Sequence, residues 1–158
     1  MTISEQLNFL ALSLVPWAQQ NKGRAFIAAD ALDAVDQLRA TPGAPTLAIL
    51  WTGRVPREPE NLGRRDNQFK LIVSRGRSLK LIPGESLSAG SAGGRPLFDL
   101  VEEAENLVLS LRLEEGESLG PDERMPVYQG TGQFEVAGLL LDAYEIRFTL
   151  AAQAPVQS

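Results

Sequence analysis

The side chains that could carry chemistry in this chain are those of serine, lysine, glutamate and arginine, because the sequence contains no histidine and no cysteine. Histidine is the commonest general base and metal ligand, and it is the usual partner of a nucleophilic serine. Ser86, Ser88 and Ser91 have Lys80 as their candidate activator, but the spacing gives a Ser-Lys pair no support. The lack of cysteine excludes disulfides and thiolate chemistry.

A glycine-rich segment, "PGESLSAGSAGGR" at 83–95, resembles a phosphate-binding loop in composition alone. It lacks the Gly-Lys-Ser/Thr ending that contacts a nucleotide and its magnesium ion. It follows an expected strand and precedes an expected helix, so anion binding at that helix start stays open as an alternative. A small ligand-binding module or a carboxylate-dependent enzyme that uses this loop is therefore the alternative functional hypothesis.

Two groups of glutamates could hold a hard cation, but neither has the spacing of a metal site. Of Glu102, Glu103 and Glu105, only the first and third share an edge of the expected helix. The glutamates of "EEGE" at 114–117 lie in a turn without calcium-loop spacing. We therefore expect no metal, no cofactor and no catalytic residue, and we predict that the protein is not an enzyme.

Four arginines fall in the segment 52–67, "TGRVPREPENLGRRDN", which its glycines and prolines predict to be a long surface loop. They are Arg54, Arg57, Arg64 and Arg65. Acidic residues offset them and no aromatic residues interleave, so the pattern does not indicate nucleic-acid binding. A partner-facing loop with complementary charges and a merely solvated loop both remain open.

The elements that must position these residues are read from the apolar periodicity. Helices are expected over 3–19, 28–40 and 96–114, and strands over 46–51, 68–82, 125–136 and 139–150. The segment 68–82 reads as one strand or as two strands that turn at "SRGR". This order predicts an α+β fold, with a mostly antiparallel sheet, helices packed on one face and a C-terminal β-hairpin. Trp17 and Trp51 are expected in the core or at its edge.

The chain has 158 residues and a formal charge of −5, which fits one globular domain. We place that domain at 1–150 and a flexible tail at 151–158. No apolar run reaches the ~20 residues of a membrane span, so no membrane partner is expected. The acidic balance also makes the chain a poor candidate for binding duplex DNA.

The expected hairpin is apolar on both faces near its turn. Tyr144, Ile146 and Phe148 alternate with polar residues and are predicted to face the helices. A two-residue turn would pair Val127 with Phe148, Gln129 with Ile146, Phe134 with Leu141 and Val136 with Leu139, and a glycine bulge is the alternative. The second face then carries an apolar area that a neighbouring subunit covers, or that packs within one chain: Phe134, Val136, Leu139 and Leu141.

The succession "AILWTG", a polar loop, "FKLIVSRGR", an amphipathic helix and "VYQGTGQFEVAGLLLDAYEIRFTL" is similar to the small tail terminator proteins of tailed bacteriophages. These proteins are also called tail completion or minor tail U-like proteins. The likeness covers roughly residues 1–150 and is a pattern of elements, not a catalytic signature. It rests on a tyrosine-glycine element before a terminal hairpin, here Tyr128, Gly130, Val136, Gly138, Asp142, Tyr144 and Phe148. Related caps occur in contractile phage-tail-like particles.

The resemblance implies a structural virion protein. Members of that family form a closed homo-oligomeric ring, typically a hexamer, that binds the end of the tail tube, stops its polymerisation and provides the head-joining surface. The implied partners are further copies of the chain, the tail tube protein and a head-tail connector protein. DNA would pass through the lumen without specific binding, and the implied location is the virion tail, assembled in the host cytoplasm.

Overall fold

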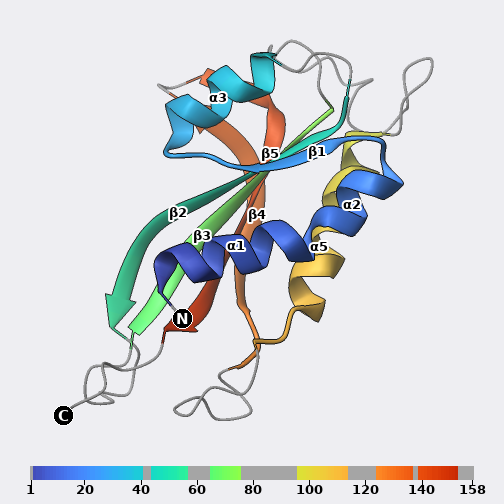
Figure 1. The fold of residues 1–158 in the computed structure, drawn as a ribbon. Helices are drawn as coiled ribbons and strands as arrows, with labels where there is room; N and C mark the ends of the chain where they lie inside the picture. Colours follow the sequence, from blue (N-terminus) through green and yellow to red (C-terminus); the bar gives the residue numbers. More distant parts are fainter. Residues whose placement is uncertain are drawn as a thin grey trace, which may run out of the picture.

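The computed structural model describes residues 2–40, 44–56, 65–75, 96–113, 124–136 and 139–152, and for 39–40 and 139–142 it describes the backbone alone. Its elements follow the chain in the order shown in Figure 1. They are α1 (Ile3–Ser13), α2 (Val15–Gln20), β1 (Arg24–Ile27), α3 (Ala31–Ala40), β2 (Thr46–Pro56), β3 (Arg65–Ser74), α5 (Leu97–Ser110), β4 (Val127–Val136) and β5 (Leu139–Ala152).

The strands form one sheet in the order β1-β2-β3-β5-β4. The pairs β2–β3, β3–β5 and β4–β5 are antiparallel, and β1 alone pairs in parallel with β2. The predicted α+β class, the mostly antiparallel sheet and the C-terminal hairpin are therefore confirmed. Strand β1 was not predicted, because its four residues "RAFI" are too short to show an alternating pattern.

The sheet carries a hydrophobic cluster on each face. Alternate residues along β2 separate the faces: Leu47 and Ile49 belong to the larger cluster, and Ala48 and Leu50 belong to the smaller one. Helices α1, α2 and α5 cover the larger cluster, which holds Ile146 and Phe148 with Tyr144 packed at its side. The prediction that these three residues face helices is confirmed, and Tyr144 meets Phe98 of α5 edge to face.

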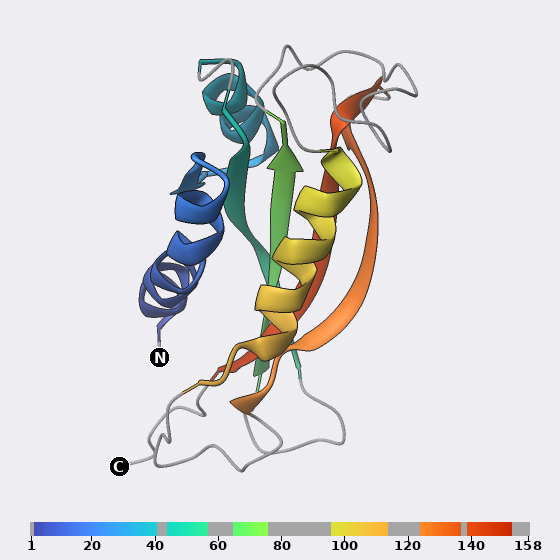
Figure 2. The ribbon, with the colours of Figure 1, turned by 90° about the vertical axis from the view of Figure 1, so that its right-hand side faces the viewer.

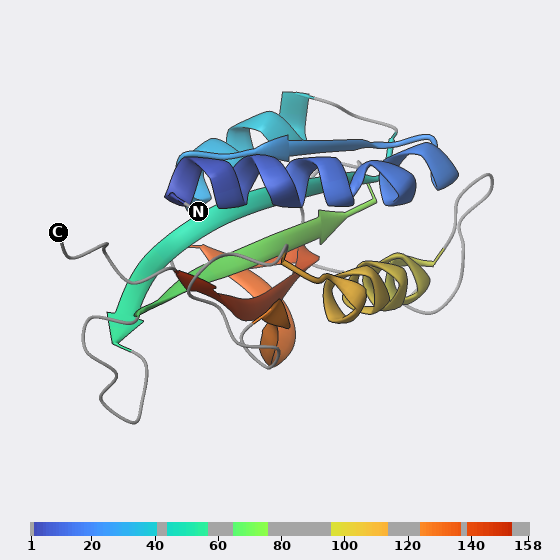
Figure 3. The ribbon, with the colours of Figure 1, turned by 60° about the horizontal axis from the view of Figure 1, so that its bottom comes forward.

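Helix α3 covers the opposite face, so the prediction that all helices pack on one face is wrong. Its Ala34, Val35 and Leu38 pack with Ile72 of β3 in the smaller cluster. In Figures 1 and 3 the edge strand β1 runs between α3 on one side and α1 on the other. The parallel β1–α3–β2 crossover produces this arrangement, because its helix must return across a face of the sheet.

The strands β2 and β3 extend into the segment predicted as a loop. Thr52–Pro56 continue β2 and Arg65–Asn67 open β3, so the loop prediction over 52–67 is wrong at both ends. Backbone pairing overrides the local turn signals here: Arg54 pairs with Asn67, and the strand accommodates Gly53, at φ 154°, at a bulge. Residues 57–64 lie outside the described residues.

The hairpin register also differs from the prediction. Val136 pairs with Leu139 as expected, but Val127 pairs with Thr149 and Thr131 pairs with Ile146. Two register shifts cause the difference: at Tyr128/Gly130 an extra residue lies in β4, and at Gln133/Glu135 the extra residues lie in β5, between Leu140 and Tyr144. The first bulge uses Gly130, whose φ of 137° favours glycine.

The predicted helices exist with altered ends. The helix over 3–19 is divided at Leu14 into α1 and α2, and Pro16 lies in the first turn of α2, where its missing N–H costs no hydrogen bond. The helix over 28–40 begins at Ala31, and that over 96–114 begins at Leu97 and ends at Ser110. The residues 151 and 152, predicted to belong to a flexible tail, complete β5.

Helix α1 begins with a capping box. The Thr2 hydroxyl accepts a hydrogen bond from the Glu5 backbone N–H at 3.1 Å, and a Glu5 carboxylate oxygen accepts one from the Thr2 backbone N–H at 3.2 Å. Hydrogen bonding to Thr2 lowers the pKa of the Glu5 carboxyl group. The Thr2 backbone makes the larger contribution and the Thr2 side chain the smaller one. These contacts fix the start of the helix that covers β2 and β1.

Gly23 connects α2 to β1 at a point without room for a side chain. A Cβ there would lie 2.1 Å from the Pro45 carbonyl oxygen, which also accepts the Arg24 N–H at 2.9 Å. Gly23→Ala is therefore expected to lower the free energy of unfolding by about 1–3 kcal/mol in urea denaturation. Gly132→Ala is the matched control, because nothing lies within 4 Å of its Cβ position. Equal stability of both variants would contradict the prediction.

Candidate functional site

The two sets of residues predicted from the sequence lie at opposite ends of the sheet. Arg65 pairs with Ala152 at one end of the β3–β5 ladder, and Ser74 pairs with Ala143 at the other end, close to the hairpin turn. Figure 2 shows both ends, with the start of β3 at the bottom and the start of β5 at the top. At ~3.4 Å per residue the ladder is about 30 Å long, so the arginines and the apolar hairpin residues do not form a common site.

The described arginines of the predicted loop lie on strands. The Arg54 Nε donates a hydrogen bond to Asn67 Oδ1 at 2.8 Å. The Arg65 Nε is buried without a hydrogen-bond partner in the described part of the chain. Arg57 and Arg64 lie outside the described residues. Arg54 is therefore fixed by the fold and is not a freely solvated loop residue.

Asn67 is the centre of a buried polar network beneath Arg54. Its Nδ2 donates to Gln6 Oε1 at 2.7 Å, and the Gln6 Nε2 donates in turn to the Ala151 carbonyl oxygen at 2.9 Å. The half-exposed Trp51 places its indole N–H 3.4 Å from Asn67 Oδ1. This network joins α1 to β3 and β5. Trp51 is exposed and belongs to neither hydrophobic cluster, so the prediction of a core or core-edge position is wrong for Trp51, whereas it is confirmed for Trp17.

The two described side chains of the predicted apolar area near the hairpin turn pack within one chain. Phe134 is only 2% exposed and packs in the smaller cluster beneath α3, and Val136 packs against the same cluster. The expectation of an uncovered apolar area is therefore wrong at Phe134, and the alternative of packing within the chain holds there. For Leu139 and Leu141 the structure describes the backbone alone, as part of β5.

A different group of apolar side chains is exposed, at the start of the outer strand β4. Met125 is 44% exposed, Val127 48% and Tyr128 42%. The Tyr128 hydroxyl lies 3.0 Å from Glu105 Oε2 and 2.6 Å from Thr131 Oγ1, so its ring is held in place by α5 and β4. We name Met125, Val127 and Tyr128 the β4 patch. This patch was not predicted from the sequence, because Val127 and Tyr128 are adjacent in the strand and therefore show no one-sided apolar pattern.

The glutamates of α5 have separate structural partners. Glu103 accepts a hydrogen bond from Asn21 Nδ2 at 3.0 Å, and Glu105 accepts one from Thr131 Oγ1 at 2.6 Å. Within the described ranges, no three acidic side chains converge as metal ligands would. Lys80, the serines at 86, 88 and 91, the glycine-rich segment 83–95 and the glutamates at 114–117 lie outside the described residues.

No protein-family model matches the chain, and no curated protein sequence matches it significantly. None of the helices in the described ranges has the length and apolar character needed to cross a membrane.

Proposed function

We propose that this chain is a bacteriophage tail terminator, a structural protein that caps the tail tube as a closed homo-oligomeric ring and presents a head-joining surface. The order of elements on which the resemblance rests is present in the fold: a buried β2, its partner β3, an amphipathic α5 and a terminal β4–β5 hairpin. The observation that carries the proposal is the β4 patch, because exposed apolar side chains at the start of an edge strand indicate an interaction surface; Val127 and Tyr128, as neighbours in the strand, expose apolar surface on opposite faces of this edge.

A ring needs two complementary and unlike surfaces on each subunit, since a cyclic interface is heterologous. The sheet has two unlike edges. At one edge the ten-residue β4 carries the β4 patch, and at the other edge the four-residue β1 carries Arg24 and the half-exposed Ile27. We infer that the β4 patch contacts a neighbouring subunit, and that the ring closes when this contact repeats around an axis. Closure ends growth, whereas a contact that did not close would produce a filament.

The acidic composition fits a channel that DNA crosses without binding. Each chain contributes a formal charge of −5, and the charges of the subunits add in a ring. A lumen with excess negative charge repels the phosphate backbone, so it disfavours specific binding and adhesion. In this proposal the tail tube protein and a head-tail connector protein contact the two faces of the ring.

The test measures assembly and capping together. Purified protein is examined by sedimentation velocity and negative-stain microscopy, alone and with the tail tube protein encoded beside it. We expect ring-shaped particles with the mass of a hexamer, and tubes that stop lengthening when the protein is added. Val127→Asp is expected to weaken subunit association by about tenfold or more, because it places a charge in an apolar contact.

Leu32→Asp is the matched control, because Leu32 is an exposed leucine on α3 and is not part of the β4 patch. It should assemble as the unaltered protein does, and both variants should retain the far-ultraviolet circular dichroism of the folded chain. If the unaltered protein neither forms rings nor caps tubes, the terminator proposal is wrong. If rings form but Val127→Asp assembles normally, the proposal survives and the assignment of the β4 patch as the subunit contact is wrong.

A further inference from the structure

A polar pocket lies on the same face of the sheet as α3, along the part of that face that the helix does not cover. It has a volume of about 350 Å³ and is open to solvent. The strands β2, β3, β4 and β5 all contribute to its lining, which consists of Thr52, Gln68, Phe69, Lys70, Gln129 and Arg147. This volume falls within the range of small-ligand sites, which is about 300–1,000 Å³. The side chains in this lining include two cations, two amides and a hydroxyl.

The two cations of this pocket are direct cross-strand partners. Lys70 of β3 is paired with Arg147 of β5 in the antiparallel register. Like charges in directly opposite positions destabilise a sheet, so this placement calls for a counter-charge. Glu145 supplies one: its Oε2 lies 3.0 Å from the Lys70 Nζ. A single carboxylate balances only one of the two cations.

Arg147 is the cation that remains. It is exposed, and within the described part of the chain it makes no hydrogen bond and no ion pair. Its guanidinium lies against the backbone of Gly130, its partner on β4: a Cβ at Gly130 would be 3.1 Å from the Arg147 Nη2. The bulge that places glycine there therefore leaves the space that the guanidinium occupies. The guanidinium therefore lies along β4 at the pocket wall, with its donors open to a ligand.

We propose that this pocket binds a carboxylate group of an acidic peptide segment, with Arg147 as the principal ligand-binding residue. A planar carboxylate matches the guanidinium fork and can accept two parallel hydrogen bonds from it. The net charge of the three ionised groups is a single positive charge, which one carboxylate neutralises. A dianionic phosphate would leave excess negative charge beside Glu145. Amide and hydroxyl groups of the lining can hydrogen-bond the adjacent peptide backbone.

The test uses a blocked amino acid that differs only in charge. N-acetylglutamate amide is titrated into ¹⁵N-labelled protein at constant ionic strength, with N-acetylglutamine amide as the neutral probe and inorganic phosphate as the dianionic probe. We expect saturable shifts of the backbone amides of Thr52, Gln68, Lys70, Gln129 and Arg147 with the glutamate probe alone. Tighter binding of phosphate would overturn the choice of carboxylate, and no saturable shift with any probe would overturn the site.

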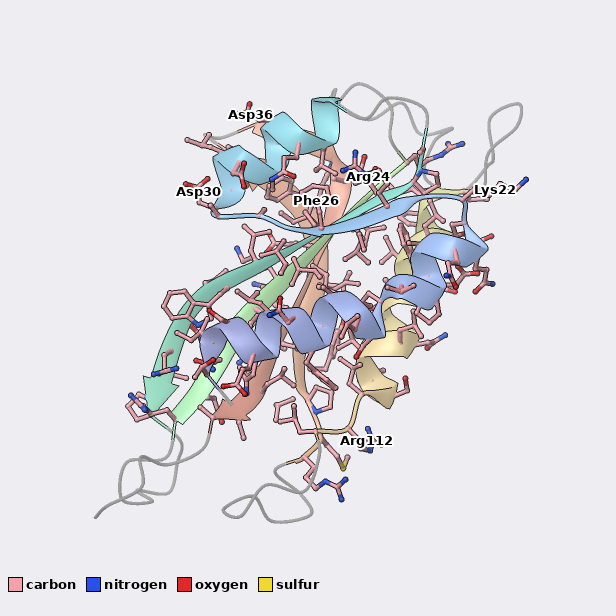
Figure 4. The ribbon with its side chains drawn as sticks, viewed as in Figure 1. Lys22, Arg24, Phe26, Asp30, Asp36 and Arg112 are labelled. Atoms are coloured by element: carbon pink, nitrogen blue, oxygen red, sulfur yellow. The ribbon has the colours of Figure 1, made fainter. Side chains whose placement is uncertain are left out.

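Arg147→Gln is expected to weaken binding of the glutamate probe by about tenfold or more, because the charged fork is lost. Arg24→Gln is the matched control, since Arg24 is an exposed arginine on β1 (Figure 4) and is not part of the pocket. It should bind the probe as the unaltered protein does, and equal binding by both variants would overturn the role of Arg147.

A second readout separates binding from a structural role. Without ligand, Arg147→Gln should melt at the same or a higher temperature than the unaltered protein, because it removes a like-charge pair. A clear fall in melting temperature would mean that Arg147 is a structural residue. This site and the ring are independent, because the probe can bind a single chain: loss of ring assembly would leave the titration unchanged, and loss of the titration would leave assembly unchanged.

Discussion

Trp17→Ala is expected to lower the free energy of unfolding by about 3–5 kcal/mol. Trp17 has no exposed surface, and it packs in the larger cluster between α2, α5 and the sheet. Its indole N–H donates to the Leu100 carbonyl oxygen of α5 at 3.0 Å. The substitution leaves a large cavity and removes this hydrogen bond. Both effects weaken the contact between α2 and α5.

Urea denaturation followed by far-ultraviolet circular dichroism measures this effect. Fluorescence is less suitable, because the chain has two tryptophans and the variant retains only the half-exposed Trp51. Trp17→Phe keeps an aromatic ring without the hydrogen-bond donor. It should therefore retain most of the stability that Trp17→Ala loses. Leu12→Ala is the control, since the side chain of Leu12 is largely exposed, and it should change the stability by less than about 0.5 kcal/mol. An effect of Trp17→Ala as small as that of Leu12→Ala would show that the core is not packed as described.

Asn67→Leu should lower the free energy of unfolding by about 2–4 kcal/mol, although the leucine side chain has the same number and branching of heavy atoms. The change removes the donor to Gln6 Oε1 and the acceptor of Arg54 Nε, and Asn67 itself is fully buried. The Gln6 side-chain carbonyl oxygen is then buried without its partner. Leaving a buried acceptor unpaired costs more free energy than the hydrogen bond contributes when it is present. Thermal and urea unfolding of the purified variant provide the measurement.

A double-mutant cycle with Gln6→Leu isolates the interaction between the two amides. If the network acts as described, Gln6→Leu/Asn67→Leu should be less destabilised than the sum of the two single variants, because the pair no longer contains an unpaired buried amide. Additive effects would mean that Gln6 and Asn67 contribute separately. The double variant also reveals whether Arg54 depends on Asn67 for its position.

The class of the fold was predictable because the long elements have strong periods. The stripe of α5 and the alternation of Tyr144, Ile146 and Phe148 both appear in the structure as expected. Which helices cover which face of the sheet was not predictable. The apolar residues Ala34 and Val35 of α3 show that one side of the helix is buried, but not which face of the sheet buries it. That choice follows from β1, whose four residues give no periodic signal.

The candidate site was less predictable than the fold, for two physical reasons. Extra residues in β5 near the turn and in β4 near Gly130 shift the register, so pairings extrapolated from the hairpin turn fail beyond Glu135 and Leu140. The pocket depends on Lys70 and Arg147 being cross-strand partners although 77 positions separate them in the chain. No local pattern contains that information. Phe134 illustrates the first reason, because its assignment to an uncovered area rested on the hairpin alone.

The bulge in β4 has a further consequence for solubility. An outer strand of ten residues offers a row of backbone donors and acceptors, which can act as a template for unregulated strand addition and aggregation. The bulge at Gly130 interrupts the regular spacing of this row and increases the twist of the strand, so an ordinary flat strand cannot pair along its whole length. A protein proposed to end the growth of a tube is thereby itself protected from growing into a fibre.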